Sequence, residues 1–163
     1  MSNYFWGNST WEERYKMILS YITTKDSVLD LGGGKGNLKG YLGDRKYQII
    51  DKECFSKDCI KFDFNNIHYP LLEHKFHYLV CSGLIEYLKY PYFFFQQLHS
   101  YGDNLIVSYR NTQPPMPEWI NNFSFEEFEK ILEQSGWNIL EYKKMPDDAE
   151  RVYLCSSFFN TGL

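Results

Sequence analysis

A run of glycines near the N-terminus carries the clearest chemical signature in this sequence. It reads Asp30-Leu31-Gly32-Gly33-Gly34-Lys35-Gly36 and lies between a short apolar segment and an expected helix. Glycines are required where the backbone turns sharply and a ligand must come close, because a Cβ atom would collide. The run therefore predicts a ligand-binding turn.

The spacing of the glycines distinguishes three kinds of site. A phosphate-binding P-loop needs Gly-x-x-x-x-Gly-Lys-Ser/Thr, but Lys35 is followed by Gly36 and Asn37. A dinucleotide fingerprint needs Gly-x-Gly-x-x-Gly, and Asn37 stands in place of its third glycine. The remaining pattern, an acidic residue followed by x-Gly-x-Gly-x-Gly, is matched in full from Asp30 to Gly36.

Two aspartates end later apolar segments of the chain. Asp51 closes the segment 47–51, and Asp63 closes the segment 60–63. Carboxylates at strand ends beside a pocket can accept hydrogen bonds from a sugar diol or an exocyclic amine. Each aspartate also has a structural interpretation, Asp51 as a helix cap or turn residue and Asp63 as part of the turn-like run 63–66. Their coincidence with the glycine turn favours a ligand site.

Alternating strands and helices must position these residues. Apolar segments predict strands at 27–31, 47–51, 60–63, 76–82, 104–109, 137–142 and 152–158. Helical spacing predicts helices at 11–22, 37–42, 91–100 and 124–135, the last opening on a capping box of Ser124 and Glu127. We therefore expect an α/β three-layer sandwich with a seven-stranded, mostly parallel Rossmann-like sheet. The final two strands have a short connection, so the last strand should be antiparallel.

The composition excludes several classes of protein. Of the 163 residues, 44% are hydrophobic and 19% aromatic, which excludes a disordered chain. The 17 Lys+Arg against 21 Asp+Glu give a net charge of −4, which argues against a nucleic-acid binder. No apolar run approaches the roughly 20 residues needed to span a bilayer, and the start of the chain does not resemble a signal peptide. We expect a cytoplasmic protein with neither a membrane nor a nucleic-acid partner.

The cysteines and histidines predict no metal site and no disulfide. The cysteines are Cys54, Cys59, Cys81 and Cys155. None forms a Cys-x-x-Cys pair, and we expect all four to be small reduced thiols. The histidines at 68, 74 and 77 have no acidic or thiol partner at ligand spacing, so we expect them in surface loops.

The segment 28–36 resembles motif I of the class I S-adenosylmethionine (SAM)-dependent methyltransferases, with Gly33 where cysteine or alanine is more usual. Asp51 stands where that family has an acidic residue that binds the ribose hydroxyls. Asp63 stands where an acidic side chain typically contacts the adenine amino group. The segment 76–88 resembles the family's fourth-strand segment, which often ends Glu-His-Leu, with Tyr87 in place of the histidine. The resemblance extends from about residue 10 to residue 159.

This resemblance implies a small, single-domain protein of bacterial type that binds SAM and needs no metal. It implies an N-terminal helix within residues 1–25, a cofactor-binding half at 27–110 and an acceptor-side half at 111–163. The cofactor-binding residues that it implies are Asp30, Gly32, Gly33, Gly34, Gly36, Asp51, Asp63 and Ser82.

The catalytic candidates follow the fourth and fifth expected strands. Methyl transfer from a sulfonium is an in-line displacement, so holding nucleophile and methyl in line can supply much of the catalysis. A general base is needed only when the acceptor carries a proton that must leave early. Glu86 could be that base or could tie down a loop, whereas Tyr109 and Arg110 could contact an acceptor or lie in a solvated loop. We take Glu86 and Tyr109 as catalytic candidates, and we expect Tyr109 and the tyrosines at 87–92 to line the cleft.

Two connections are shorter than those of a complete member of this family. Only eight residues separate Asp51 from Ile60, fewer than the dozen or so that a helical crossover requires. The helix there should be missing or reduced to a turn, and the segment 65–75 is also short.

The resemblance implies a methyltransferase, and the absence of a large insertion favours a small-molecule or sugar acceptor. The alternative is a non-catalytic SAM-binding sensor or accessory subunit, which would keep the same glycine turn and Asp51. The chain could also form a homodimer, or a partner subunit could complete its cleft.

Overall fold

The computed structural model describes residues 9–23 and 26–159, with the side chains of residues 9 and 10 outside the description. Seven strands form one sheet in the order β3-β2-β1-β4-β5-β7-β6. The strands are β1 (Val28–Leu31), β2 (Tyr47–Asp51), β3 (Ile60–Lys61), β4 (Tyr78–Cys81), β5 (Asn104–Arg110), β6 (Trp137–Lys144) and β7 (Glu150–Ser157). Strands β1 to β5 pair in parallel, and β7 runs antiparallel to both β5 and β6. The predicted sheet and its antiparallel last strand are confirmed.

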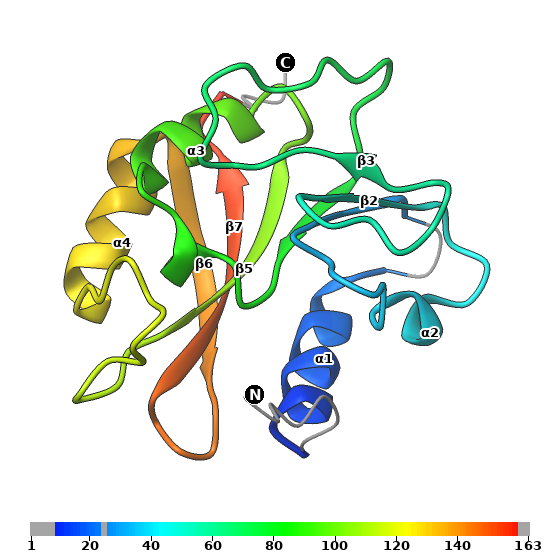
Figure 1. The fold of residues 1–163 in the computed structure, drawn as a ribbon. Coiled ribbons are helices and arrows are strands. Elements are labelled where there is room, and N and C mark those ends of the chain that lie inside the picture. The colour runs from blue at the N-terminus through cyan, green and yellow to red at the C-terminus, as the bar shows by residue number, and fades with distance from the viewer. Residues whose placement is uncertain (1–8, 24–25, 160–163) are drawn as a thin grey trace.

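The helices form a layer on each face of the sheet. They are α1 (Ser9–Tyr21), α2 (Lys39–Leu42), α3 (Pro91–Leu98) and α4 (Phe125–Gln134), with a 3-10 turn η1 (Ile85–Tyr87) after β4. Helices α1 and α2 lie on one side, and α3 and α4 lie on the other (Figure 1). The predicted three-layer α/β sandwich is therefore confirmed.

Local sequence accounts for the elements that frame the core. All four residues of β1 are buried, as expected for a central parallel strand covered by helices on both faces. Helix α4 begins with the predicted capping box, in which Ser124 and Glu127 exchange hydrogen bonds with each other's backbone N–H groups. Trp137, fully buried at the start of β6, donates its indole N–H to the Phe95 carbonyl of α3 at 2.9 Å. This bond joins the sheet to its helical layer.

The connections flanking β3 contain no helix, as the short spacing predicts. Residues 52–59 and 62–77, all of them described, form turns, bends and one isolated bridge. Strand β3 has two residues rather than the expected four, because the chain turns at Asp63. The Asp63 side chain accepts the Asn65 N–H at 2.9 Å, and its carbonyl accepts the Asn66 N–H at 2.9 Å.

The two edge strands differ in length and regularity. Strand β3, at one edge, spans only Ile60–Lys61. Strand β6, at the other, spans eight residues but changes register between Ile139 and Glu141. Leu140, which falls in this bulge, is exposed.

The expectation of four reduced cysteines is wrong for two of them. Without a helix between β2 and β3, the loop folds back and brings the Cα atoms of Cys54 and Cys59 to 5.5 Å, where the two side chains form a disulfide. Cys81 and Cys155 are free, buried thiols, as expected.

Within residues 9–23 and 26–159, no helix is long and apolar enough to cross a membrane. The same residues contain no cluster of three metal-ligating side chains.

Candidate functional site

A cavity of about 250 Å³ lies at the carboxyl ends of β1, β2 and β4. Parallel strands present this edge to ligands in open α/β sheets. Residues of α1, the glycine turn, the start of the β2–β3 loop and the turn after β4 line it. The lining residues are Trp11, Tyr15, Asp30, Gly32, Gly33, Gly34, Lys35, Asn37, Asp51, Lys52, Glu53, Phe55, Ser82 and Gly83.

The glycine turn has open space beside Gly34 and packs closely on Asp30 at Gly33. Gly34 has a φ of +55°, and a Cβ atom built on it would meet no atom within 4 Å. A Cβ atom on Gly33 would instead lie 2.5 Å from Oδ2 of Asp30. The turn therefore needs glycine at position 33 for close packing and at position 34 for its left-handed backbone and open space.

Asp30 is buried beneath this turn and also borders the cavity. The hydroxyl of Tyr47, at the start of β2, donates a hydrogen bond to its Oδ2. Burial raises the pKa of Asp30 to about 7, although the Tyr47 hydrogen bond opposes the shift. The acidic residue of the motif is thus fixed in the floor of the site.

Asp51 joins the glycine turn to the loop after β2. Its Oδ2 accepts the Gly34 N–H at 2.9 Å, and its Oδ1 accepts the Glu53 N–H at 3.0 Å. An ionised carboxylate offers about four lone-pair positions, so both oxygens can still accept hydrogen bonds from a ligand. The residue predicted to bind the ribose therefore holds the glycine turn to the loop after β2.

Most of the predicted cofactor residues meet at this cavity. Six of them line it, namely Asp30, Gly32, Gly33, Gly34, Asp51 and Ser82. Gly36 does not; it has a φ of +77°, and a Cβ there would lie 2.9 Å from Cδ1 of Ile49. Asp63 is also absent from the cavity lining, and its carboxylate closes the turn after β3.

The sequence patterns did not predict three aromatic residues that line the cavity. Trp11 and Tyr15 lie on the apolar face of α1, where helical spacing predicted only core packing. Phe55 lies in the β2–β3 loop and had no pattern to mark it. Side chains from elements far apart in sequence meet here, so only the fold reveals their shared position.

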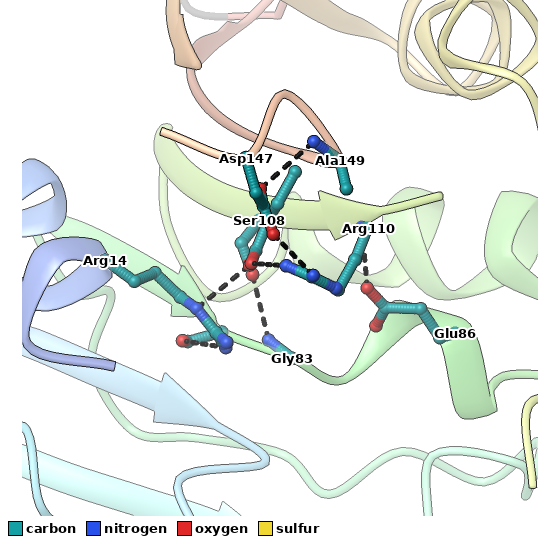
Figure 2. A network of polar contacts seen from close by, with 9 residues as sticks. Arg14, Gly83, Glu86, Ser108, Arg110, Asp147 and Ala149 are labelled. Carbon is teal, nitrogen blue, oxygen red and sulfur yellow. Dashed lines mark hydrogen bonds and ion pairs between the residues drawn. The ribbon is translucent and has the colours of Figure 1, made fainter. Parts of the chain in front are cut away.

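A buried polar network around Arg14, Glu86 and Arg110 (Figure 2) adjoins Ser82 and Gly83 of the cavity lining. Nε of Arg14, on α1, lies 2.9 Å from Oε1 of Glu150 on β7. Nη1 of Arg14 donates a hydrogen bond to Oγ of Ser82 at 3.2 Å. Nη1 of Arg110 lies 3.3 Å from the other carboxylate oxygen of Glu150, and its Nη2 pairs with Asp147. Arg14 and Glu150 are almost fully buried, so their charges rely on each other.

Glu86 belongs to the packing of this region and does not line the cavity. Its side chain is 2% exposed, and its Oε1 accepts the Arg110 N–H at 2.8 Å. Its Oε2 has no hydrogen-bond partner among the described residues. Burial raises the pKa of Glu86 to about 7. These contacts agree with the loop-tying alternative, in which Glu86 holds η1 to the end of β5.

Tyr109 is a core residue, which contradicts its expected place in the cleft. Its side chain is fully buried, and its ring stacks on Phe128 with centroids 4.3 Å apart. Its hydroxyl donates to Oδ1 of Asn121 at 3.0 Å and accepts the Phe123 N–H at 2.6 Å. Inward alternation along β5 places the ring in the core, where it supports the 121–123 loop. The tyrosines at 87–92 are exposed and likewise absent from the cavity lining.

Replacing Glu86 with glutamine should change how stability depends on pH. An ordinary glutamate titrates near 4.5, whereas folded Glu86 titrates at about 7, so the folded chain holds its proton more tightly. The contribution of Glu86 to wild-type stability should therefore fall as pH rises from about 4.5 to 7, and glutamine removes this contribution. Between pH 4.5 and pH 7, we expect the free energy of unfolding of Glu86→Gln to rise by about 3 kcal/mol relative to that of the wild type. Urea unfolding at pH 4.5, 6 and 8 measures it, and a difference independent of pH would contradict it.

The comparisons with known proteins show the fold. No protein-family model matches the sequence, and neither does any curated protein. Among solved structures, the chain is similar to the 1,6-didemethyltoxoflavin-N1-methyltransferase of Burkholderia thailandensis, which was solved with 1,6-didemethyltoxoflavin and S-adenosylhomocysteine (SAH) bound. The TM-score is 0.71 at 11% identity, over 91% of this chain and 78% of that one.

Two further solved structures broaden the comparison. A SAM-dependent methyltransferase from Aquifex aeolicus matches with a TM-score of 0.68 at 17% identity, covering 86% of this chain and 88% of that one. The small RNA methyltransferase HEN1 matches with a TM-score of 0.73 at 16% identity, covering 96% of this chain but only 26% of that one. The chain therefore has the fold of the class I SAM-dependent methyltransferases, a fold shared by enzymes with different acceptors.

Proposed function

We propose that this chain binds SAM in the cavity and transfers its methyl group to a small-molecule or sugar acceptor. One observation carries the proposal. The glycine turn after β1 and the carboxylate at the end of β2 are joined by the Gly34–Asp51 hydrogen bond on the wall of the cavity. This arrangement occurs in a sheet whose fold is that of methyltransferases.

The residues of the cavity suit an adenosyl ligand. Asp51 keeps acceptor capacity for the two hydroxyls of a ribose, and Gly34 leaves open space beside it. Trp11, Tyr15 and Phe55 supply aromatic surface for apolar parts of the ligand. When bound, SAM would supply an electrophilic methyl group on a sulfonium. Asp63 is left out of the proposed site, because its carboxylate caps a turn.

The chain's own contribution to methyl transfer would be mainly alignment. Glu86 and Tyr109, the two expected catalytic residues, lie outside the cavity lining, so neither is placed to take a proton there. Holding an acceptor in line with the methyl group can lower the barrier without a protein base. This favours acceptors with an already basic or easily deprotonated atom. The net charge of −4 supports an acceptor other than a nucleic acid.

A non-catalytic SAM sensor or accessory subunit is the second candidate. It is favoured by the same observation, that both expected catalytic side chains lie outside the cavity lining. A structure of the SAH complex separates the two candidates. Access from solvent to the sulfur supports an enzyme, whereas a wall of protein around the sulfur supports a sensor.

SAH binding measured by calorimetry tests the proposed site. We expect the wild-type chain to bind, and Gly34→Ala to weaken binding about tenfold, because its Cβ enters the space left for the ligand. Gly43→Ala is the matched control, since Gly43 has a φ of +60° and a Cβ there also meets no atom within 4 Å, but the residue caps α2 and does not line the cavity. Absence of binding to the wild-type chain, or equal affinities for the two variants, would refute the proposed site.

A further inference from the structure

The loop from residue 52 to residue 59 replaces the missing helix between β2 and β3 and forms one wall of the cavity. Lys52, Glu53 and Phe55 line the cavity, and the Cys54–Cys59 disulfide closes the loop around Phe55. Neither cysteine has a part in the proposed methyl transfer. The disulfide is therefore a covalent feature of the site that the proposed function leaves unexplained.

Few other contacts hold this loop in place. Residues 52–58 are all exposed, so none of their side chains is anchored in the core. At its start, the Glu53 N–H donates to Asp51, and near its end the Gln48 amide donates to the Asp58 carbonyl. Phe55 is 59% exposed, and its ring lies 5.8 Å from Nζ of Lys35 on the glycine turn. The disulfide is the strongest restraint on the part of the loop that carries Phe55.

We propose that the Cys54–Cys59 disulfide is a redox clamp that holds Phe55 at the cavity, so that the oxidised chain binds the adenosyl ligand more tightly than the reduced chain. The inference rests on the proposed function and adds a form of regulation to the same site. A cross-link lowers the entropy of a loop, so less must be lost when a ligand orders it. In the reduced chain the loop would keep this entropy until the ligand binds, so binding would have to order the loop and the affinity would be lower.

The chemistry balances with a small-molecule disulfide such as oxidised glutathione as the oxidant. One cysteine thiolate attacks this disulfide, forms a mixed disulfide and releases one glutathione thiol. The other cysteine then attacks the mixed disulfide, closes the Cys54–Cys59 bond and releases the second thiol. Reduced thiols reverse both steps. Exposure of Cys54 allows the exchange, whereas Cys81 and Cys155 are buried, which raises the pKa of both thiols.

Calorimetric titration with SAH, on the full chain in both redox states, tests the clamp. We expect reduction with dithiothreitol to raise the dissociation constant about three- to tenfold, and oxidised glutathione to restore it. Alkylation followed by mass spectrometry should show two more reactive thiols after reduction. The matched control is Cys54→Ser/Cys59→Ser, which should keep the weaker affinity with or without reductant. A thermal melt of this variant checks its folding, and the comparison of wild-type states does not depend on it.

Two results would overturn the clamp alone. One is equal SAH affinity in the oxidised and reduced wild-type chain. The other is a chain whose Cys54 and Cys59 stay alkylatable after treatment with oxidised glutathione. A chain that forms the disulfide but binds no SAH in either state would instead refute the proposed function, and the clamp with it.

Discussion

Replacing Arg14 with methionine should lower the free energy of unfolding by about 3–5 kcal/mol, the usual effect of removing one partner of a buried ion pair. Methionine keeps much of the length and the apolar stem but removes the charge that lies 2.9 Å from Glu150. Glu150 is 1% exposed, so water cannot replace the lost partner. Arg110 remains, but 3.3 Å from the other carboxylate oxygen and shared with Asp147. Urea unfolding of the two proteins measures the difference.

Two further variants show whether the buried charge causes this loss. Lys75→Met breaks the exposed ion pair with Asp103 and should change stability by less than about 1 kcal/mol. Adding Glu150→Gln to Arg14→Met should recover part of the lost stability, because the uncompensated carboxylate is then gone. An Arg14→Met chain that is no less stable than Lys75→Met would show that the network contributes little to folding.

Replacing Asp51 with alanine should weaken SAH binding by about 1–3 kcal/mol, or about 5- to 150-fold. The change removes the proposed acceptor for the ribose hydroxyls. It also removes the hydrogen-bond acceptor of the Gly34 and Glu53 N–H groups. The glycine turn and the β2–β3 loop are then no longer joined through this side chain. The measurement is a calorimetric titration of each variant with SAH.

Two other aspartate variants serve as controls for this effect. Asp51→Asn keeps one carbonyl oxygen for the Gly34 N–H and should show an intermediate affinity. Asp63→Ala should leave SAH affinity unchanged, because Asp63 caps the turn after β3 and does not line the cavity. A loss at Asp63 as large as that at Asp51 would restore the adenine contact expected from the resemblance. An unaffected Asp51→Ala variant would remove Asp51 from the site.

The place of the glycine turn and of Asp51 at the cavity was predictable, because these residues lie at or next to the strand ends that position them. The run from Asp30 to Gly34 covers the end of β1 and the turn directly after it, and Asp51 ends β2. The parallel pairing of these strands brings both to one edge of the sheet. A local pattern was enough to find them, because local sequence also sets their position.

The wrong predictions concern residues whose roles depend on distant partners. The sequence placed Tyr109 at a strand end near the cleft, but Asn121 and Phe123 bind its hydroxyl inside the core. Spacing gave no sign that Cys54 and Cys59 would meet, because that contact follows from the loop's return to β3. No local pattern predicted a role for Arg14 of α1, since its partner Glu150 lies 136 positions further along the chain. Long-range pairing decides each of these cases, and no pattern within one segment reports it.

The two edges of the sheet have a consequence for how this protein meets other chains. An exposed edge strand can template the addition of a foreign strand, which is a common route to aggregation. Strand β3 offers only two residues for such pairing, and β6 is interrupted by its bulge and carries Glu141, Lys143 and Lys144. Both features discourage strand addition. The sheet is therefore protected at both edges against extension by a strand of another molecule.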